Sequence, residues 1–192
     1  GLRADDHSEL ANSIVSPRVA VRYKPGRSLN IRFSWATGFL APEVFNEDLH
    51  IEIANGAAQV IRNAPDLEEE GSSSYSLGAE WFPASDLGQM RVEANLFYTD
   101  IRDSFQVVER DDPGTPEQTE FVRTNGSGSE VYGIELNTGL VRSGLFSLDA
   151  GIVLQRARYD VPEPDFGSLR LLRTPQVTGV ASFTWRGWRP WE

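Results

Sequence analysis

The sequence predicts an all-β protein, an antiparallel up-and-down meander of about seven strands that forms part of a transmembrane β-barrel. Three observations support this fold class. Apolar and polar residues alternate with a period of two in most segments that show any period, as they do in strands. No segment has the apolar spacing of a convincing helix. The connections between strands are alternately short and long, which is typical of outer-membrane barrels.

The first two predicted strands form a hairpin. The clearest alternation is in residues 29–36, where one face carries Leu29, Ile31, Phe33 and Trp35. Residues 18–23 alternate in the same way. The Pro25-Gly26 step between the two segments is typical of a tight turn.

Five further segments repeat this pattern, so the predicted strands continue with residues 75–81, 90–99, 132–140, 146–155 and 176–185. The short connections lie near residues 24–28, 83–89 and 141–144. The long, polar connections, which we predict to be loops, lie near residues 39–74, 106–130 and 160–174. Consecutive antiparallel strands place alternate connections at opposite ends of a sheet, so one end should carry turns and the other end loops.

Composition excludes several classes of function. The 192 residues include 18 Lys and Arg against 28 Asp and Glu, for a formal net charge of −10, which argues against a nucleic-acid partner. Cysteine is absent, which rules out disulfides and thiolate metal sites. No window approaches the run of about 18 apolar residues that a membrane helix needs. A barrel strand, by contrast, needs apolar residues only at every second position.

The two faces of the predicted strands differ in chemistry. Aromatic residues near the strand ends are expected at the membrane interface, and they are Tyr23, Trp35, Tyr75, Trp81, Tyr98, Tyr132 and Trp185. The opposite face is charged and small. Each such charge would cost about 2–4 kcal/mol near the middle of a bilayer, so this face should meet water, a lumen or another piece of protein. In a soluble sandwich the same residues would form the solvated outer face.

The residues predict neither catalysis nor a resident metal or cofactor. No Ser-His-acid set is recognisable by spacing, and we expect no enzymatic activity and no catalytic residue. His7 and His50, the two histidines, fall in predicted loops and are too few for a zinc site. The acidic residues 66–70 and the Asp111-Asp112 pair are interpreted as a solvated loop and a turn. Residues 126–129, Gly-Ser-Gly-Ser, precede a strand rather than a helix, so we interpret them as a loop and not as a phosphate cradle.

Five motifs in order along the chain carry a family resemblance. Residues 32–43 form a strand ending in a Gly-Phe-x-Ala-Pro corner, and the other motifs are Ser16-Pro17-Arg18, residues 76–81 with 92–103, residues 125–136 with a Gly-Ile-Glu core, and Arg173-Thr174-Pro175. Together they resemble the barrel of TonB-dependent receptors. The resemblance implies a barrel of about 22 strands in the cell outer membrane of a Gram-negative bacterium, enclosing an N-terminal plug. It also implies active uptake of a scarce ligand such as a ferric siderophore, cobalamin or an oligosaccharide.

The resemblance also implies partners. They are the outer-membrane lipid, the protein's own plug domain and, through its TonB box, TonB, together with a small-molecule or metal-chelate ligand. By analogy, the charged face should line the lumen and contact the plug, with the candidate residues Arg18, Arg22, Arg32, Glu80, Arg91, Glu93 and Glu135. Ligand contacts are expected from the long loops.

About seven strands cannot close a barrel of that size. We therefore expect residues 1–192 to be a partial barrel domain, without the plug, the first strands and the last strands. Two alternatives remain open at this point: a small complete outer-membrane barrel of about eight strands, and a soluble all-β carbohydrate-binding module. In the soluble module, Phe33, Leu96 and Ile152 would pack together in a central core.

Overall fold

The computed structural model describes residues 1–6, 13–42, 58–110, 118–163 and 167–186. Every regular element in these ranges is a β-strand. None of the described residues belongs to a helix long and apolar enough to cross a membrane.

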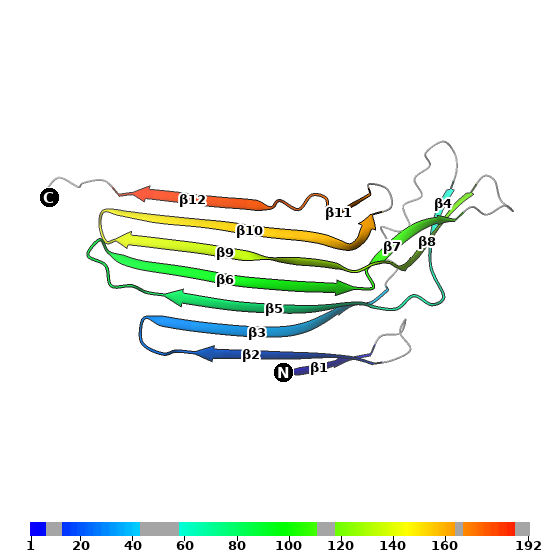
Figure 1. Ribbon diagram of the computed structural model, residues 1–192, viewed down its shortest axis with the longest axis horizontal. Coiled ribbons are helices and arrows are strands. Elements are labelled where there is room, and N and C mark those ends of the chain that lie inside the picture. The colour runs from blue at the N-terminus through cyan, green and yellow to red at the C-terminus, as the bar shows by residue number, and fades with distance from the viewer. Residues whose placement is uncertain (7–12, 43–57, 111–117, 164–166, 187–192) are drawn as a thin grey trace.

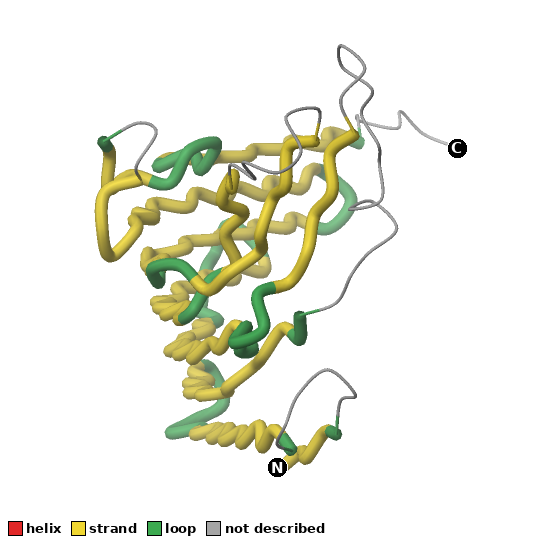
Figure 2. The backbone as a smooth tube through the Cα atoms, turned by 90° about the vertical axis from the view of Figure 1, so that its right-hand side faces the viewer, coloured by secondary structure: helices red, strands yellow, loops and turns green. Residues whose placement is uncertain are grey.

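The main sheet is an antiparallel meander of seven long strands (Figure 1). They are β2 (Ile14–Tyr23), β3 (Leu29–Leu40), β5 (Glu70–Trp81), β6 (Gln89–Arg102), β9 (Ser129–Arg142), β10 (Phe146–Glu163) and β12 (Val177–Trp185). Two short strands extend it: β1 (Leu2–Asp5) pairs with β2, and β11 (Ser168–Arg170) pairs with β10 beside β12. The predicted fold class is thereby confirmed. Figure 2 shows the strands following one another along a curved surface.

The two ends of this sheet differ as the sequence predicted. The turns that join β2 to β3, β5 to β6 and β9 to β10 all lie at one end, on the left in Figure 1. The long connections lie at the opposite end, which we call the loop end. Short strands also form within these long connections.

A second, three-stranded sheet lies at the loop end (Figure 1). It contains β4 (Ala58–Asn63), β7 (Phe105–Arg110) and β8 (Gln118–Asn125); β8 pairs antiparallel with β7 and parallel with β4. The prediction that residues 39–74, 106–130 and 160–174 are loops was therefore wrong in part. β4 and β8 pair across a large distance in sequence, which local alternation does not reveal.

The main sheet has almost no hydrophobic core. Among the described residues, the buried hydrophobic ones are Ala41 and Ala157. Phe33, Leu96 and Ile152 remain 40%, 51% and 39% exposed. In a two-layer sandwich these side chains would be covered by a second sheet, so the described residues do not form the soluble sandwich that was one of the alternatives.

Candidate functional site

One face of the main sheet is apolar across its whole width. The pairing register places one side chain from each long strand in a single row: Val21, Phe33, Leu77, Leu96, Ile134, Leu154 and Val177. Residues directly opposite each other in antiparallel strands point to the same side of a sheet. We call the side that carries this row the apolar face and the other side the polar face.

Aromatic residues border the apolar face toward the loop end. Trp35, Tyr75, Tyr98 and Tyr132 lie opposite one another on four successive strands and form what we call the aromatic row. The ring centroids of Trp35 and Tyr75 are 6.4 Å apart, and those of Tyr75 and Tyr98 are 6.3 Å apart. The turn end of the same face carries Tyr23, Trp81, Phe146 and Trp185. The predicted aromatic residues thus lie at both ends of the apolar face.

The height of the apolar face matches a bilayer. On β9 this face is bounded by the charged residues Glu130 and Arg142. The stretch between them measures about 40 Å at roughly 3.4 Å per residue. At the tilt of about 40° that is usual for membrane barrels, it would span about 30 Å, which is the thickness of a hydrocarbon layer.

All seven charged residues predicted to line a lumen lie on the polar face. Arg22 is opposite Arg32, and Glu80 is opposite both Asn30 and Glu93. The pairing register places the other charged residues on the same face: Arg18 lies opposite Ala36, Arg91 opposite Gly139 and Glu135 opposite Asn95. The structure therefore brings these residues to one surface, with three arginines on β2 and β3 and the carboxylates on β5, β6 and β9.

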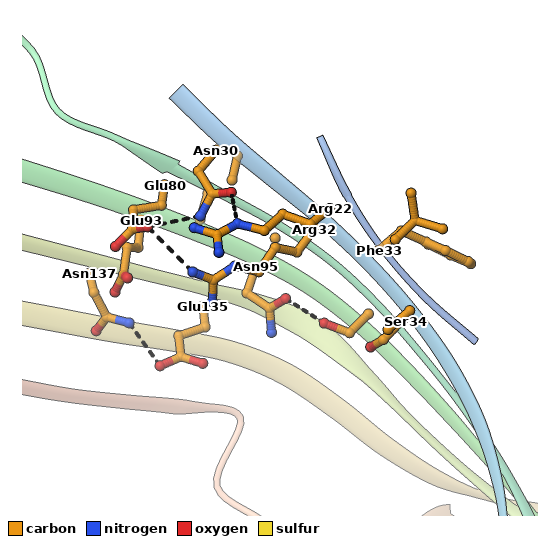
Figure 3. Close-up of a pocket in the computed structure, with 16 residues that line it drawn as sticks. Arg22, Asn30, Arg32, Phe33, Ser34, Glu80, Glu93, Asn95, Glu135 and Asn137 are labelled. Carbon is orange, nitrogen blue, oxygen red and sulfur yellow. Dashed lines mark hydrogen bonds and ion pairs between the residues drawn. The ribbon is translucent and has the colours of Figure 1, made fainter. Parts of the chain in front are cut away.

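The centre of the polar face holds a hollow of about 490 Å³, lined by side chains from five strands (Figure 3). Arg22 Nε donates a hydrogen bond to Asn30 Oδ1 at 2.7 Å, and Asn30 Nδ2 donates to Glu80 Oε2 at 3.1 Å. Arg32 forms an ion pair with the same carboxylate at 3.6 Å. Asn30 is buried, with 5% of its surface exposed. Alternation predicts only that Asn30 lies on the polar side of its strand, so sequence analysis missed its bridging role.

A second set of contacts lies in and beside the part of the hollow formed by β5, β6 and β9. Arg91 pairs with Glu93 at 3.7 Å, and Asn137 Nδ2 donates to Glu135 Oε1 at 2.8 Å. Ser76 Oγ donates to Asn95 Oδ1 at 2.7 Å. These contacts do not bring Arg18 into the network. Several charged groups of the polar face thus have hydrogen-bond or ion-pair partners on the same face.

The long connections are held together at Asn125, the last residue of β8. Its Nδ2 donates to the backbone oxygens of Glu68 and Asp103, at 3.0 and 2.8 Å, and its Oδ1 accepts from Glu68 N at 2.8 Å. Glu70, from the acidic segment, accepts a hydrogen bond from Phe105 N at 3.2 Å. The predicted loop at residues 126–129 is a tight corner, in which a side chain at Gly128 would meet Ile101 O and Asp160. These residues fix loop geometry.

Several other sequence predictions fall outside the described residues, namely those on His7, His50 and Asp111-Asp112. Within the described ranges, no group of three or more His, Asp or Glu residues is close enough together to hold a metal ion.

The comparisons with known proteins agree with this geometry. A protein-family model described as TonB dependent receptor-like, beta-barrel matches residues 1–192. No curated protein matches the sequence. The FrpB iron transporter from Neisseria meningitidis (F3-3 variant) has a TM-score of 0.66 and 17% identity, over 93% of this chain and 25% of FrpB.

Two further solved structures share the fold. The siderophore receptor PirA from Pseudomonas aeruginosa has a TM-score of 0.70 and 18% identity, over 96% of this chain and 33% of PirA. The copper transporter OprC has a TM-score of 0.61 and 12% identity, over 91% of this chain and 24% of OprC. The chain therefore spans about a quarter to a third of the length of these proteins. Because the family model matches every residue, the chain belongs to the family of TonB-dependent receptor β-barrels.

Proposed function

We propose that residues 1–192 form part of the barrel wall of an outer-membrane receptor that takes up a scarce ligand, and that they catalyse no reaction. The observation that carries this proposal is the exposed apolar face, which runs across seven strands while the described residues bury two hydrophobic side chains. A contiguous apolar surface of this extent marks a membrane or protein contact. The aromatic borders and the height of the face favour the membrane of a Gram-negative cell.

The backbone supports the same conclusion. Each unpaired N–H or C=O group costs several kcal/mol in hydrocarbon, so a sheet can span a bilayer only if its strands close into a barrel. The long strands from β3 to β10 are paired on both sides, whereas β12 pairs only with β10 among the described strands. In the proposed receptor, further strands would pair with the two open edges of this sheet.

The polar face supports an enclosed interior filled by protein. Asn30 and Asn137 donate hydrogen bonds to two of its carboxylates, and further arginines and carboxylates line the hollow. We propose that this face contacts the receptor's plug domain through Arg22, Arg32, Glu93 and Glu135. Energy for uptake would then enter from TonB through that plug.

The class of ligand is proposed from the structural neighbours. FrpB is an iron transporter, PirA a siderophore receptor and OprC a copper transporter. We propose a metal ion or metal chelate, with a ferric siderophore as the first candidate. The long connections, ordered at Asn125 and by the three-stranded sheet, would contact it on the outer side.

Uptake measurements test this function. Deleting the gene from its native host should abolish accumulation of one labelled metal chelate under metal starvation, and deleting TonB should have the same effect. Radiolabelled ferric siderophores and copper are the probes, and a plasmid copy of the gene should restore uptake. Unchanged accumulation of every probe in the deletion strain would contradict the proposed ligand class.

A further inference from the structure

Three arginines lie together where the apolar face ends at the loop end. On β10 the residues of this face are, in order, Leu154, Arg156 and Arg158, because alternate residues of a strand share a side. Arg156 lies opposite Tyr132, the last member of the aromatic row. Arg158 lies opposite Arg170 on β11, so the three guanidinium groups occupy neighbouring positions.

A chain of side-chain contacts fixes the side on which this cluster lies. Tyr98, a member of the aromatic row, donates a hydrogen bond from its hydroxyl to Glu130 Oε2 at 3.0 Å. The other oxygen of Glu130 accepts a hydrogen bond from Arg158 Nε. Arg158 is therefore on the outward, apolar side of the sheet, directly beyond the aromatic row, rather than in the interior with Arg22 and Arg32.

The charges of this cluster are only partly balanced. Glu130 neutralises Arg158, whose side chain is still 57% exposed. Arg156 and Arg170 are both exposed, and within the described residues neither forms an ion pair. Asp100 lies farther along the face and pairs with Arg102 at 3.9 Å. Asp160, two residues beyond Arg158 on the same strand, also attracts the Arg158 guanidinium electrostatically. Among the described residues, Arg156 and Arg170 therefore have no carboxylate partner.

The position of the cluster relative to the membrane indicates which anion it would meet. In the proposed receptor the aromatic row lies at the level of the lipid headgroups, so the groups that meet Arg156 and Arg170 from outside are headgroup phosphates. Guanidinium binds phosphate oxygens in pairs, through two parallel hydrogen bonds. The long arginine stems can lie along the apolar surface while their charged ends reach the headgroups.

We propose that Arg156 and Arg170, arranged around the Arg158–Glu130 pair, bind the phosphate group of a membrane lipid at the outer rim of the barrel. This site rests on the proposed membrane function and adds a lipid ligand to it. It would fix the height of the wall in the bilayer at β10 and β11, next to the long connections.

Lipid binding by the complete receptor in detergent micelles tests the site. The probes are dioleoylphosphatidic acid and dioleoylglycerol, which differ only in the phosphate group, and bound lipid is counted by native mass spectrometry. The wild-type protein should prefer the phosphatidic acid. The double variant Arg156→Gln/Arg170→Gln should lose about 25-fold in affinity for it, since each cation near the surface contributes a factor of about five.

Arg18→Gln is the matched control, because Arg18 is an exposed arginine on the polar face of β2, which the proposed receptor turns away from lipid. This control should bind phosphatidic acid like the wild type. Equal binding of both lipids by the wild type, or equal losses in the double variant and the control, would overturn the proposal. Displacement of the lipid by an equal concentration of inorganic phosphate would also overturn it, because the ligand would then be free phosphate.

Folding is checked for each variant by its heat-dependent mobility in gels, and the single variants Arg156→Gln and Arg170→Gln replace the double variant if that one does not fold. Each should lose about fivefold in affinity. If the wild-type receptor takes up its ligand but shows no preference for phosphatidic acid, only the lipid site is contradicted. If it prefers phosphatidic acid but takes up none of the tested metal chelates, only the receptor function is contradicted.

Discussion

Asn30 lies between an arginine and a carboxylate, and its amide links the two across three strands. It accepts a hydrogen bond from Arg22 Nε and donates one to Glu80 Oε2. An amide can do both at once, whereas a charged residue at this position would repel one of its neighbours. Its burial at 5% exposure shows that the polar face packs closely at this point.

Replacing this amide should weaken the barrel wall. We expect Asn30→Ala to lower the free energy of unfolding by about 1–2 kcal/mol, because Arg22 and Glu80 each lose a partner in a partly buried place. Denaturant unfolding of the complete barrel in lipid vesicles measures the change. The control is Asn137→Ala, where the amide donates to Glu135 on its own strand and bridges no other described strand. An equal loss in both variants would contradict the bridging role of Asn30.

Gly133 shows a different effect of a single residue, since its missing side chain makes room for an aromatic ring. Phe97 lies opposite it on the polar face. A Cβ atom added at Gly133 would come within 2.8 Å of Phe97 Cζ and would press on Leu154 O. The ring covers a part of the strand that would otherwise lack a side chain.

Gly133→Ala should therefore destabilise the barrel by about 1–3 kcal/mol through overpacking. Gly179→Ala serves as the control, because the nearest atom to an added Cβ there is Gly151 O at an ordinary 3.5 Å. The control variant should be as stable as the wild type or slightly more stable. Thermal unfolding in detergent compares the two, and a Gly133→Ala protein with wild-type stability would show that the ring moves away without cost.

At the scale of the strand, the alternation of apolar and polar residues was enough to predict the long strands. Every predicted strand core falls inside an observed strand apart from Gln176, and the predicted charged residues share one face. The three-stranded sheet was missed, because the parallel pair of β4 and β8 joins segments that no local pattern relates. For the site, alternation predicted which residues share the polar face, because the side to which a residue points follows from its place in the strand. It did not predict which of these residues bond to one another.

Two neighbouring positions on β9 test which face meets lipid. Leu136 is in the middle of the apolar face and Asn137 is the next residue, on the polar face at the same depth. Leu136→Arg should destabilise the barrel by about 2–4 kcal/mol and lower its amount in the membrane. Asn137→Arg places the same charge near Glu93 and Glu135, and it should be tolerated. Equal tolerance of both variants in membrane fractions would argue against a lipid-facing Leu136.

At the scale of the whole molecule, the described sheet is a curved wall with two open edges (Figure 2). The outer sides of β1 and β12 offer unpaired backbone groups, and the apolar face offers a second surface for association. Such edges recruit strands from other chains unless they are covered. In the proposed receptor, neighbouring strands and lipid would cover these surfaces.

Expression of residues 1–192 alone tests this dependence. We expect the isolated chain to aggregate in plain buffer and to require detergent, because its apolar face has nothing to cover it. Light scattering after size exclusion, with circular dichroism to record strand content, measures the outcome. A monomeric, cooperatively folding chain without detergent would refute the assignment of the apolar face to lipid.

The sequence by itself determined the strands, their faces and the alternation of short and long connections, since the two-residue period follows from the local geometry of an extended chain. Tertiary structure decided the register. It placed the four residues of the aromatic row opposite one another, joined Asn30 to Glu80 across fifty residues and placed Arg170 opposite Arg158. These contacts depend on which strands pair and at what offset, and that choice is made by the whole sheet rather than by any one segment.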